Sequence, residues 1–150
     1  MNTLYGDNIF NINEAASISK YKNIENFDML KSQWKDVFKY IIDKFSEYYI
    51  NDCKESVSRK DIEQGIEITS IESYTDPKGY TFIIGIKMNS KFMSKVKDRH
   101  YPAVEITFDS NRKFNESHSR IYFDGWYLFP LLFMSRGILI HILLILVFRR

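Results

Sequence analysis

The chain has 150 residues, the length of one domain with room for a real hydrophobic core. Its formal net charge is +2, and residues 1–125 carry 18 Lys and Arg against 19 Asp and Glu, so the strong basic footprint of a general nucleic-acid-binding protein is absent from the sequence. A single cysteine, Cys53, excludes an internal disulfide and a cysteine-based zinc site.

The first 26 residues are weakly patterned and rich in Asn and Ser, so we expect a weakly ordered lead-in over residues 1–26. Residues 1–10 contain neither a positively charged start nor an apolar stretch, and therefore do not resemble a signal peptide. Together with the lone cysteine, this predicts a reducing, cytoplasmic environment for the main domain.

A long amphipathic helix is predicted over residues 27–48, because apolar side chains recur there at spacings of three and four residues. Asn26 or Asp28 is a candidate N-cap, since either side chain can accept a hydrogen bond from the first free amides. We interpret the apolar stripe as core, with a ligand-binding or partner-binding stripe as the rarer alternative. Its members are Phe27, Leu30, Trp34, Val37, Phe38, Ile41, Phe45 and Tyr48.

A short helical turn is predicted to begin after Ser58, which caps it, and to end at Gly65. After this turn the apolar residues recur at every second position, the pattern of a strand, instead of every three or four positions. A first strand starts at Ile66 and has a predicted bulge near residues 70–71. Residues 76–79, Asp-Pro-Lys-Gly, have the composition of a type I turn. A second strand over residues 80–88 is apolar on both faces and is therefore placed centrally in the sheet.

A third strand is predicted over residues 104–108 and a fourth over residues 119–123, ending at Asp124-Gly125. The predicted fold class is α+β: a long amphipathic helix packed on an antiparallel sheet of about four strands, followed by a C-terminal hydrophobic helix. The predicted division is a lead-in over 1–26, an α+β domain over 27–125 and a hydrophobic segment over 126–148.

One cluster of cations lies between the second and third predicted strands and is a possible contact for an anionic surface. Interleaved aromatic residues such as Phe92 and Tyr101 also fit a site for phosphates and stacked bases. A basic segment lying on anionic lipid is a second interpretation. The commonest interpretation is a solvated connection whose Phe92, Met93 and Val96 pack into the core. The cations are Lys87, Lys91, Lys95, Lys97 and Arg99.

Motifs for catalysis are sparse, and we predict no catalytic residue, no metal site and no cofactor. His100 and His118 flank the third predicted strand and are within possible reach of Asp98, Glu105 or Asp124, which allows a weak hypothesis of an acid–base or metal site. Cys53 has no neighbouring histidine in the sequence and is interpreted as a packing residue.

The segment over residues 126–148 is a candidate transmembrane helix, because fifteen of its twenty-three residues are Leu, Ile, Val or Phe. Arg136 near its centre costs about 2.5 to 3.5 kcal/mol, which the apolar residues outweigh with roughly −4 to −9 kcal/mol. Two other interpretations are open. Asp124-Gly125 is typical of a hairpin turn, which would make the tail part of a soluble core; the tail could instead be the end of a truncated or frame-shifted reading frame. The residues that define the candidate span are Trp126, Leu131, Phe133, Ile138, Ile142, Leu144 and Phe148.

The leading functional hypothesis is a non-enzymatic protein-interaction module of unknown partner, tethered to the cell membrane by the tail with its main domain in the cytoplasm. It predicts a protein partner and membrane lipid, with nucleic acid an unfavoured partner and no small-molecule substrate. The alternative is a soluble, cytoplasmic, immunity-type protein that neutralises a toxin and buries the tail in its core. A third and weaker hypothesis is a hydrolase or nuclease that uses His100 and His118.

Overall fold

The computed structural model describes residue 21 and residues 23–126, and its main helices precede the strands along the chain. The helical part consists of α2 (Phe27–Ser32), α3 (Trp34–Ser46), the π-helix η2 (Glu47–Asp52) and α4 (Arg59–Gly65). The strands are β1 (Ile66–Asp76), β2 (Gly79–Met88), β3 (His100–Asp109) and β4 (Arg120–Trp126). Short helices α5 (Ser90–Met93) and η3 (Glu116–His118) lie in the connections on either side of β3.

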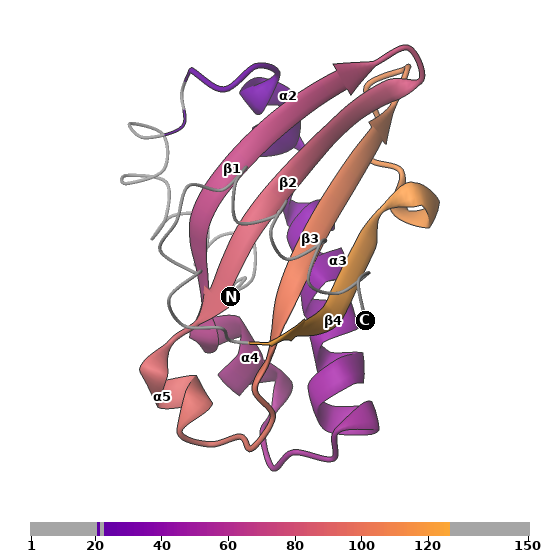
Figure 1. Cartoon of the computed structure of the whole chain (residues 1–150). Coiled ribbons are helices and arrows are strands. Elements are labelled where there is room, and N and C mark those ends of the chain that lie inside the picture. Colours follow the sequence, from indigo (N-terminus) through magenta and orange to yellow (C-terminus); the bar gives the residue numbers. More distant parts are fainter. Residues whose placement is uncertain (1–20, 22, 127–150) are drawn as a thin grey trace, which may run out of the picture.

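The four strands form one antiparallel sheet in the order β1-β2-β3-β4. Figure 1 shows α2 and α3 behind one face of this sheet, with α4 and α5 at the end where β1 starts. The predicted α+β class with a four-stranded antiparallel sheet is confirmed. The predicted C-terminal hydrophobic helix falls outside the described residues.

The core lies between the sheet and α3. On β2 the side chains of Phe82, Ile84 and Ile86 alternate with less buried neighbours, and on β3 Ile106 and Phe108 are fully buried. Each such side chain contributes about 1.5 to 3 kcal/mol when it leaves water. The facing residues of α3 have no exposed surface; they are Val37, Phe38, Ile41, Ile42 and Phe45. The core interpretation of the apolar stripe is therefore confirmed for these residues and for Phe27, Leu30 and Trp34, whereas Tyr48 at its end is only partly buried.

The predicted single helix over 27–48 is interrupted at Gln33, which separates α2 from α3. The Gln33 side-chain amide donates to the Arg112 carbonyl (2.7 Å) and accepts from the Phe114 amide (2.8 Å), so the break is fixed by a loop far along the chain. Asn26 precedes α2 in a left-handed conformation and makes no side-chain cap, contrary to the prediction. Tyr21, within the predicted lead-in, is buried in the core.

The predictions for α4 and for the first two strands agree more closely with the structure. Ser58 caps α4 and forms a reciprocal capping box with Asp61. The register of β1 against β2 shifts between Ile68 and Ser70, where the bulge was predicted. Residues 77–78 form the turn between β1 and β2, and β2 is an inner strand, as its two apolar faces indicate.

Strand β4 departs from the prediction at its end. The Asp124-Gly125 pair is not a hairpin turn: the strand continues through it, with Gly125 opposite Tyr101 and Trp126 opposite His100. A Cβ atom at Gly125 would lie 2.5 Å from the Tyr101 ring, so glycine is required here by close packing rather than by a turn. Trp126, the first residue of the predicted membrane segment, is the last residue of β4.

In the described part of the chain no helix combines the length and the apolar character that crossing a bilayer requires. The other residues that define the candidate span lie outside the described residues. They are Leu131, Phe133, Ile138, Ile142, Leu144 and Phe148.

Candidate functional site

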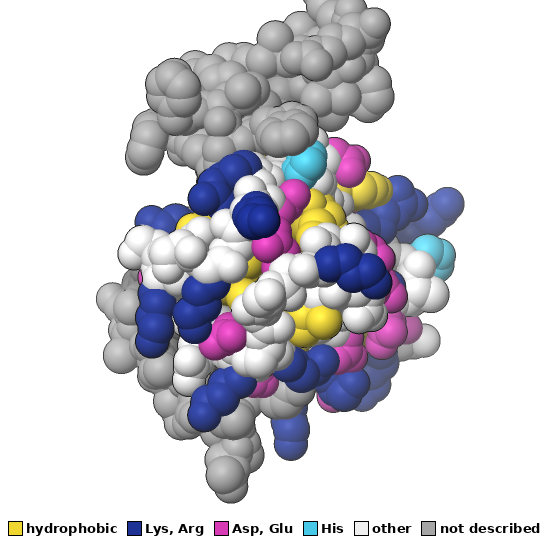
Figure 2. Space-filling view, turned by 90° about the horizontal axis from the view of Figure 1, so that it is seen from below, with side chains coloured by type: hydrophobic (Ala, Val, Ile, Leu, Met, Phe, Trp, Pro, Cys, Tyr) yellow, Lys and Arg dark blue, Asp and Glu magenta, His cyan; other side chains and the backbone are white. Residues whose placement is uncertain are grey.

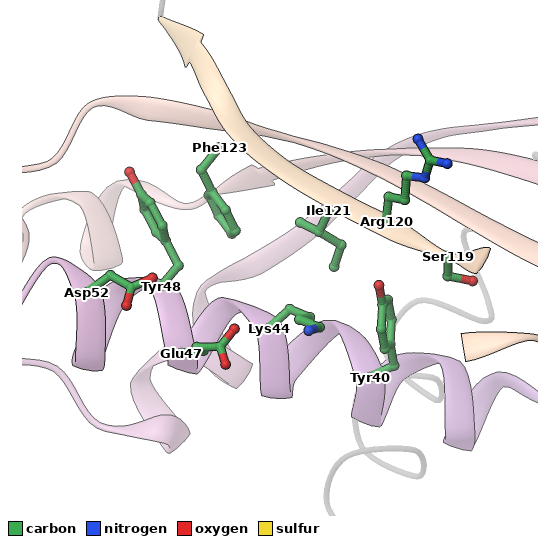
Figure 3. Close-up of a pocket in the computed structure, with 9 residues that line it drawn as sticks. All are labelled: Tyr40, Lys44, Glu47, Tyr48, Asp52, Ser119, Arg120, Ile121 and Phe123. Carbon is green, nitrogen blue, oxygen red and sulfur yellow. The ribbon is translucent and has the colours of Figure 1, made fainter. Parts of the chain in front are cut away.

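A groove of about 330 Å³ runs between the helix formed by α3 and η2 and the outer strand β4. Figure 3 shows Tyr40 and Lys44 on the helix facing Ile121 on the strand, with Tyr48 and Phe123 side by side at one end. Its lining residues are Tyr40, Lys44, Glu47, Tyr48, Asp52, Ser119, Arg120, Ile121 and Phe123.

The apolar side of the groove is made by alternate residues of β4. Ile121 and Phe123 are partly buried and pack against the core. The Phe123 ring stacks on Tyr48 with centroids 3.8 Å apart and planes 4° apart, and meets Phe45 edge-on at 5.0 Å. An edge-on aromatic pair such as that of Phe123 with Phe45 contributes about 0.5 to 1.5 kcal/mol beyond its buried area. Strand β4 is therefore held firmly against the helix end.

The opposite face of β4 points to solvent. Tyr122 is 43% exposed, and Arg120 on the same face is exposed too, as is Asp124 where the register against β3 shifts. The Arg120 guanidinium donates to the Tyr122 hydroxyl at 3.1 Å, which holds the two side chains together along the strand. Figure 3 shows Arg120 directed away from the helix.

Strand β4 pairs with β3 along one edge, and along its other edge no strand among residues 23–126 pairs with it. A strand in this position presents backbone N–H and C=O groups that can pair with another chain. We call this outer edge from Arg120 to Asp124, together with the groove beside it, the edge surface.

A polar cluster supports the end of the groove near Tyr48. The Tyr48 hydroxyl donates to Asp98 Oδ2 at 2.8 Å, and His100 Nδ1 lies 2.9 Å from Asp98 Oδ1. The backbone amide of Asp98 donates to the Glu55 carboxylate at 2.8 Å. Burial, followed by the hydrogen bond to Asp98, raises the pKa of Tyr48 above its usual value, so this phenol stays protonated and acts as a donor.

Cys53 adjoins this cluster but is not activated. Burial is the main reason why its pKa is raised, and the negative charge of Asp98 adds to the effect. A thiol whose pKa is raised is a weak nucleophile at neutral pH. The interpretation of Cys53 as a packing residue agrees with this environment.

The predicted pair of histidines is not brought together. His100 contacts Asp98, as its position in the sequence allowed, whereas the His118 carbonyl accepts from Thr107 near the far end of β3. Seven residues of strand separate these positions, or roughly 23 Å. His118 Nδ1 lies instead 2.7 Å from the Asn115 amide nitrogen. In the described part of the chain, no three metal-ligating side chains gather where an ion could bind.

The five predicted surface cations do not form one continuous patch. Lys87 lies 3.9 Å from Glu67, and Lys95 pairs with Asp61 at 3.0 Å. Arg99 donates back to the carbonyls of Val96 and Asp98. Lys91 and Lys97 are exposed. Figure 2, which views this end of the molecule, shows cationic side chains separated by acidic and uncharged ones.

The apolar residues of this segment are part of the core. Phe92 is 2% exposed and Val96 is also buried, as the interpretation of a solvated connection requires. Phe92 is therefore not accessible for stacking on a base. Binding of lipid or nucleic acid by Lys87, Lys91, Lys95, Lys97 and Arg99 stays a prediction.

Sequence reasoning placed Tyr48 and Phe123 in a helix stripe and a strand but did not bring them together. The signal that singles out Tyr48 is its hydroxyl, at the end of a stripe that is otherwise almost entirely apolar. No protein-family model matches the chain, and comparison with curated proteins and with solved structures gives no match. The edge surface is therefore the feature from which we infer function.

Proposed function

We propose that the protein is a non-enzymatic interaction module, held at a membrane by the hydrophobic segment that follows β4, and that it binds the extended segment of another polypeptide along the edge surface. The observation that carries the proposal is the outer edge of β4 beside the groove, with which no strand of residues 23–126 pairs. Strand addition at such an edge obtains affinity from main-chain hydrogen bonds and specificity from the side chains on either side.

The groove offers the specificity that strand addition needs. An added strand would place alternate side chains against Ile121 and Phe123 on the helix side and against Tyr122 on the solvent side. The half-buried residues would lose their remaining contact with water, which favours binding through the hydrophobic effect. The ring contacts of Phe123 with Tyr48 and Phe45 already order this part of β4, which reduces the conformational entropy that β4 itself loses on binding.

Two observations support the tether. The buried cluster from Tyr21 to Phe108 draws its members from helices and strands of the described part, so apolar residues of a domain-sized core are already present there. After Trp126, residues 127–148 still match the roughly 20 apolar residues that span a hydrocarbon layer. The alternative, a soluble immunity-type protein, instead needs the tail as part of its core.

The test is a full-length variant carrying Ile138→Asp, Ile142→Asp and Leu144→Asp. Each mid-span Asp costs about 2.5 to 3.5 kcal/mol, and three of them outweigh the favourable insertion energy of the segment. We expect the unmodified chain to remain in carbonate-washed membranes and the variant to move to the supernatant with an unchanged circular dichroism spectrum. Ser56→Asp, at an exposed loop position, is the matched control and should stay in the membranes.

The soluble alternative gives the opposite pattern. The unmodified chain would then be recovered without detergent, and the triple variant would lose its folded spectrum because three charges enter its core. That result would overturn the membrane tether.

A further inference from the structure

We infer that the end of the domain that carries α5 rests on anionic phospholipid headgroups and so orients the domain on the membrane that holds it. This inference rests on the proposed membrane tether, and it adds to that proposal the lipid class and the face of the domain that meets the membrane. The contact is made by four cations on and after α5, which we call the basic end: Lys91, Lys95, Lys97 and Arg99.

The basic end lies where the proposed tether leaves the domain. Trp126, the last residue of β4, is paired with His100, the first residue of β3, and Lys97 lies three residues before His100. The Cα atoms of Lys97 and Trp126 are therefore separated by no more than roughly 16 Å. Figure 1 shows α5 and the end of β4 at the same end of the sheet. A tether that starts here keeps the basic end near the headgroups and raises the effective concentration of lipid.

Charge is distributed unevenly over the described part of the chain. Residues 87–99 carry five cations and one anion, whereas the other described residues carry eleven cations and sixteen anions. An anionic lipid surface therefore attracts residues 87–99 and repels the remainder of the domain. Each Lys or Arg close to such a surface strengthens binding by a factor of about five.

The carboxylates closest to the basic end are held by bonds within the domain. Glu55 accepts the backbone amides of Lys97 at 3.0 Å and of Asp98 at 2.8 Å. The side chain of Asp98 is 13% exposed, and that of Asp61, which pairs with Lys95, is 27% exposed. These carboxylates lower the local positive charge, but their own bonds keep them against the domain.

Two lysines of the basic end are the cations most available to lipid. Lys91 and Lys97 are exposed, and neither forms an ion pair with another described residue. A lysine side chain is long and keeps its charged end in water. We therefore assign the strongest lipid contacts to Lys91 and Lys97.

Lipid fits the basic end better than nucleic acid does. Figure 2 shows cationic side chains at this end separated by acidic and uncharged ones. Lipids diffuse in the membrane and can move to separate cations, whereas the phosphates of a nucleic acid are fixed along its backbone. Phe92 is buried and offers no ring on which a base could stack.

Energy transfer to dye-labelled headgroups tests the orientation. The full-length chain, with Cys53→Ser, carries a donor dye at Ser94→Cys in the basic end or at Ser110→Cys just after β3, the control at the other end of the strand. In phosphatidylcholine vesicles with about one third phosphatidylserine, we expect greater transfer from position 94 than in pure phosphatidylcholine vesicles. We expect no such increase from position 110. The increase should disappear in about 1 M salt, where the Debye length is about 3 Å. Transfer from position 94 that does not depend on phosphatidylserine would overturn the inference.

A double charge variant tests the assigned lysines. Lys91→Gln with Lys97→Gln removes two charges without breaking an ion pair of the described residues. We expect the ratio of docked to undocked domains in single-molecule transfer to fall about 25-fold. Lys35→Gln with Lys113→Gln, at exposed positions away from α5, is the matched control and should leave the ratio unchanged. Equal effects of the two double variants would show that net charge alone matters, and would overturn the assignment.

The outcomes for the tether and for the basic end are separable. A chain that stays in carbonate-washed membranes, but whose position 94 does not respond to phosphatidylserine, would refute the lipid contact and leave the tether standing. A chain recovered without detergent that sediments with anionic but not with neutral vesicles would refute the tether and leave the lipid contact standing. Binding of single-stranded nucleic acid through Lys91 and Lys97, without binding of vesicles, would refute the lipid contact.

Discussion

The ring of Tyr48 lies parallel to that of Phe123, 3.8 Å away, while its hydroxyl donates to Asp98 at 2.8 Å. One side chain therefore connects the helix end, the outer strand β4 and the segment before β3. The ring supplies the wall of the groove, and the hydroxyl fixes the orientation of the ring. The edge surface depends on this arrangement.

Removing only the hydroxyl separates these two roles. Tyr48→Phe keeps the stacked ring but takes a donor from Asp98, whose side chain is 13% exposed. A hydrogen bond to a charged group contributes about 1.5 to 3 kcal/mol, so we expect the free energy of unfolding in urea to fall by this amount. Tyr74→Phe, which removes the hydroxyl's hydrogen bond to Glu72 at an exposed site, should change it by less than about 0.5 kcal/mol. Equal losses in the two variants would contradict the role of Tyr48.

The buried carboxyl of Glu63 predicts a pH dependence. Burial raises its pKa, while Arg59 and Lys60 lower it by a smaller amount. A carboxyl with a raised folded-state pKa stabilises the fold fully below its unfolded pKa, and this contribution is lost as the pH rises through the folded-state pKa. We therefore expect Glu63→Gln to raise the free energy of unfolding at pH 7 and to leave it nearly unchanged near pH 4. Urea unfolding at both pH values measures this, and a variant destabilised at pH 7 would show that the charged form is the stabilising one.

Gly79 starts β2 opposite Asp109 of β3. A Cβ atom there would clash with the carbonyl oxygen of Phe108, which is backbone and cannot turn aside. We expect Gly79→Ala to reduce the free energy of unfolding by about 1 to 3 kcal/mol, the usual cost of overpacking. Thr75→Ala, at an exposed position of the neighbouring strand, should have a much smaller effect in the same thermal melt. A neutral Gly79→Ala would mean that β2 and β3 can separate at this end without loss.

The features that sequence reasoning predicted correctly are those with a local cause. The β1 bulge, the turn at residues 77–78 and the Ser58 cap follow from neighbours within a few residues, and the central place of β2 follows from its own two faces. The contact between His100 and Asp98 also joins residues two positions apart. In each case the pattern and its physical cause occupy the same stretch of chain.

The features that sequence reasoning missed depend on residues that are far apart in the sequence. The helix break at Gln33 is fixed by Arg112 and Phe114, about eighty residues away in the sequence. Gly125 is required by the ring of Tyr101 rather than by a turn, although Asp-Gly is a strong hairpin signal on its own. The groove could not be predicted, because Tyr48 and Phe123 meet only once α3 has packed across the sheet.

The π-helix η2 positions Tyr48 in the groove, and this determines which homologues can have the same groove. The Cys53 amide donates to the Tyr48 carbonyl five residues back, which is the bond of a wide turn holding one residue more than an α-helical turn. This wide turn carries Tyr48 and Tyr49, adjacent residues that both face inward, one onto Phe123 and the other into the core. A homologue with one residue fewer between Ser46 and Cys53 would form an ordinary α-helical turn here, and its tyrosine side chain would point in another direction. The number of residues between Ser46 and Cys53 should therefore indicate, better than the residue type at any single position, which homologues have the groove.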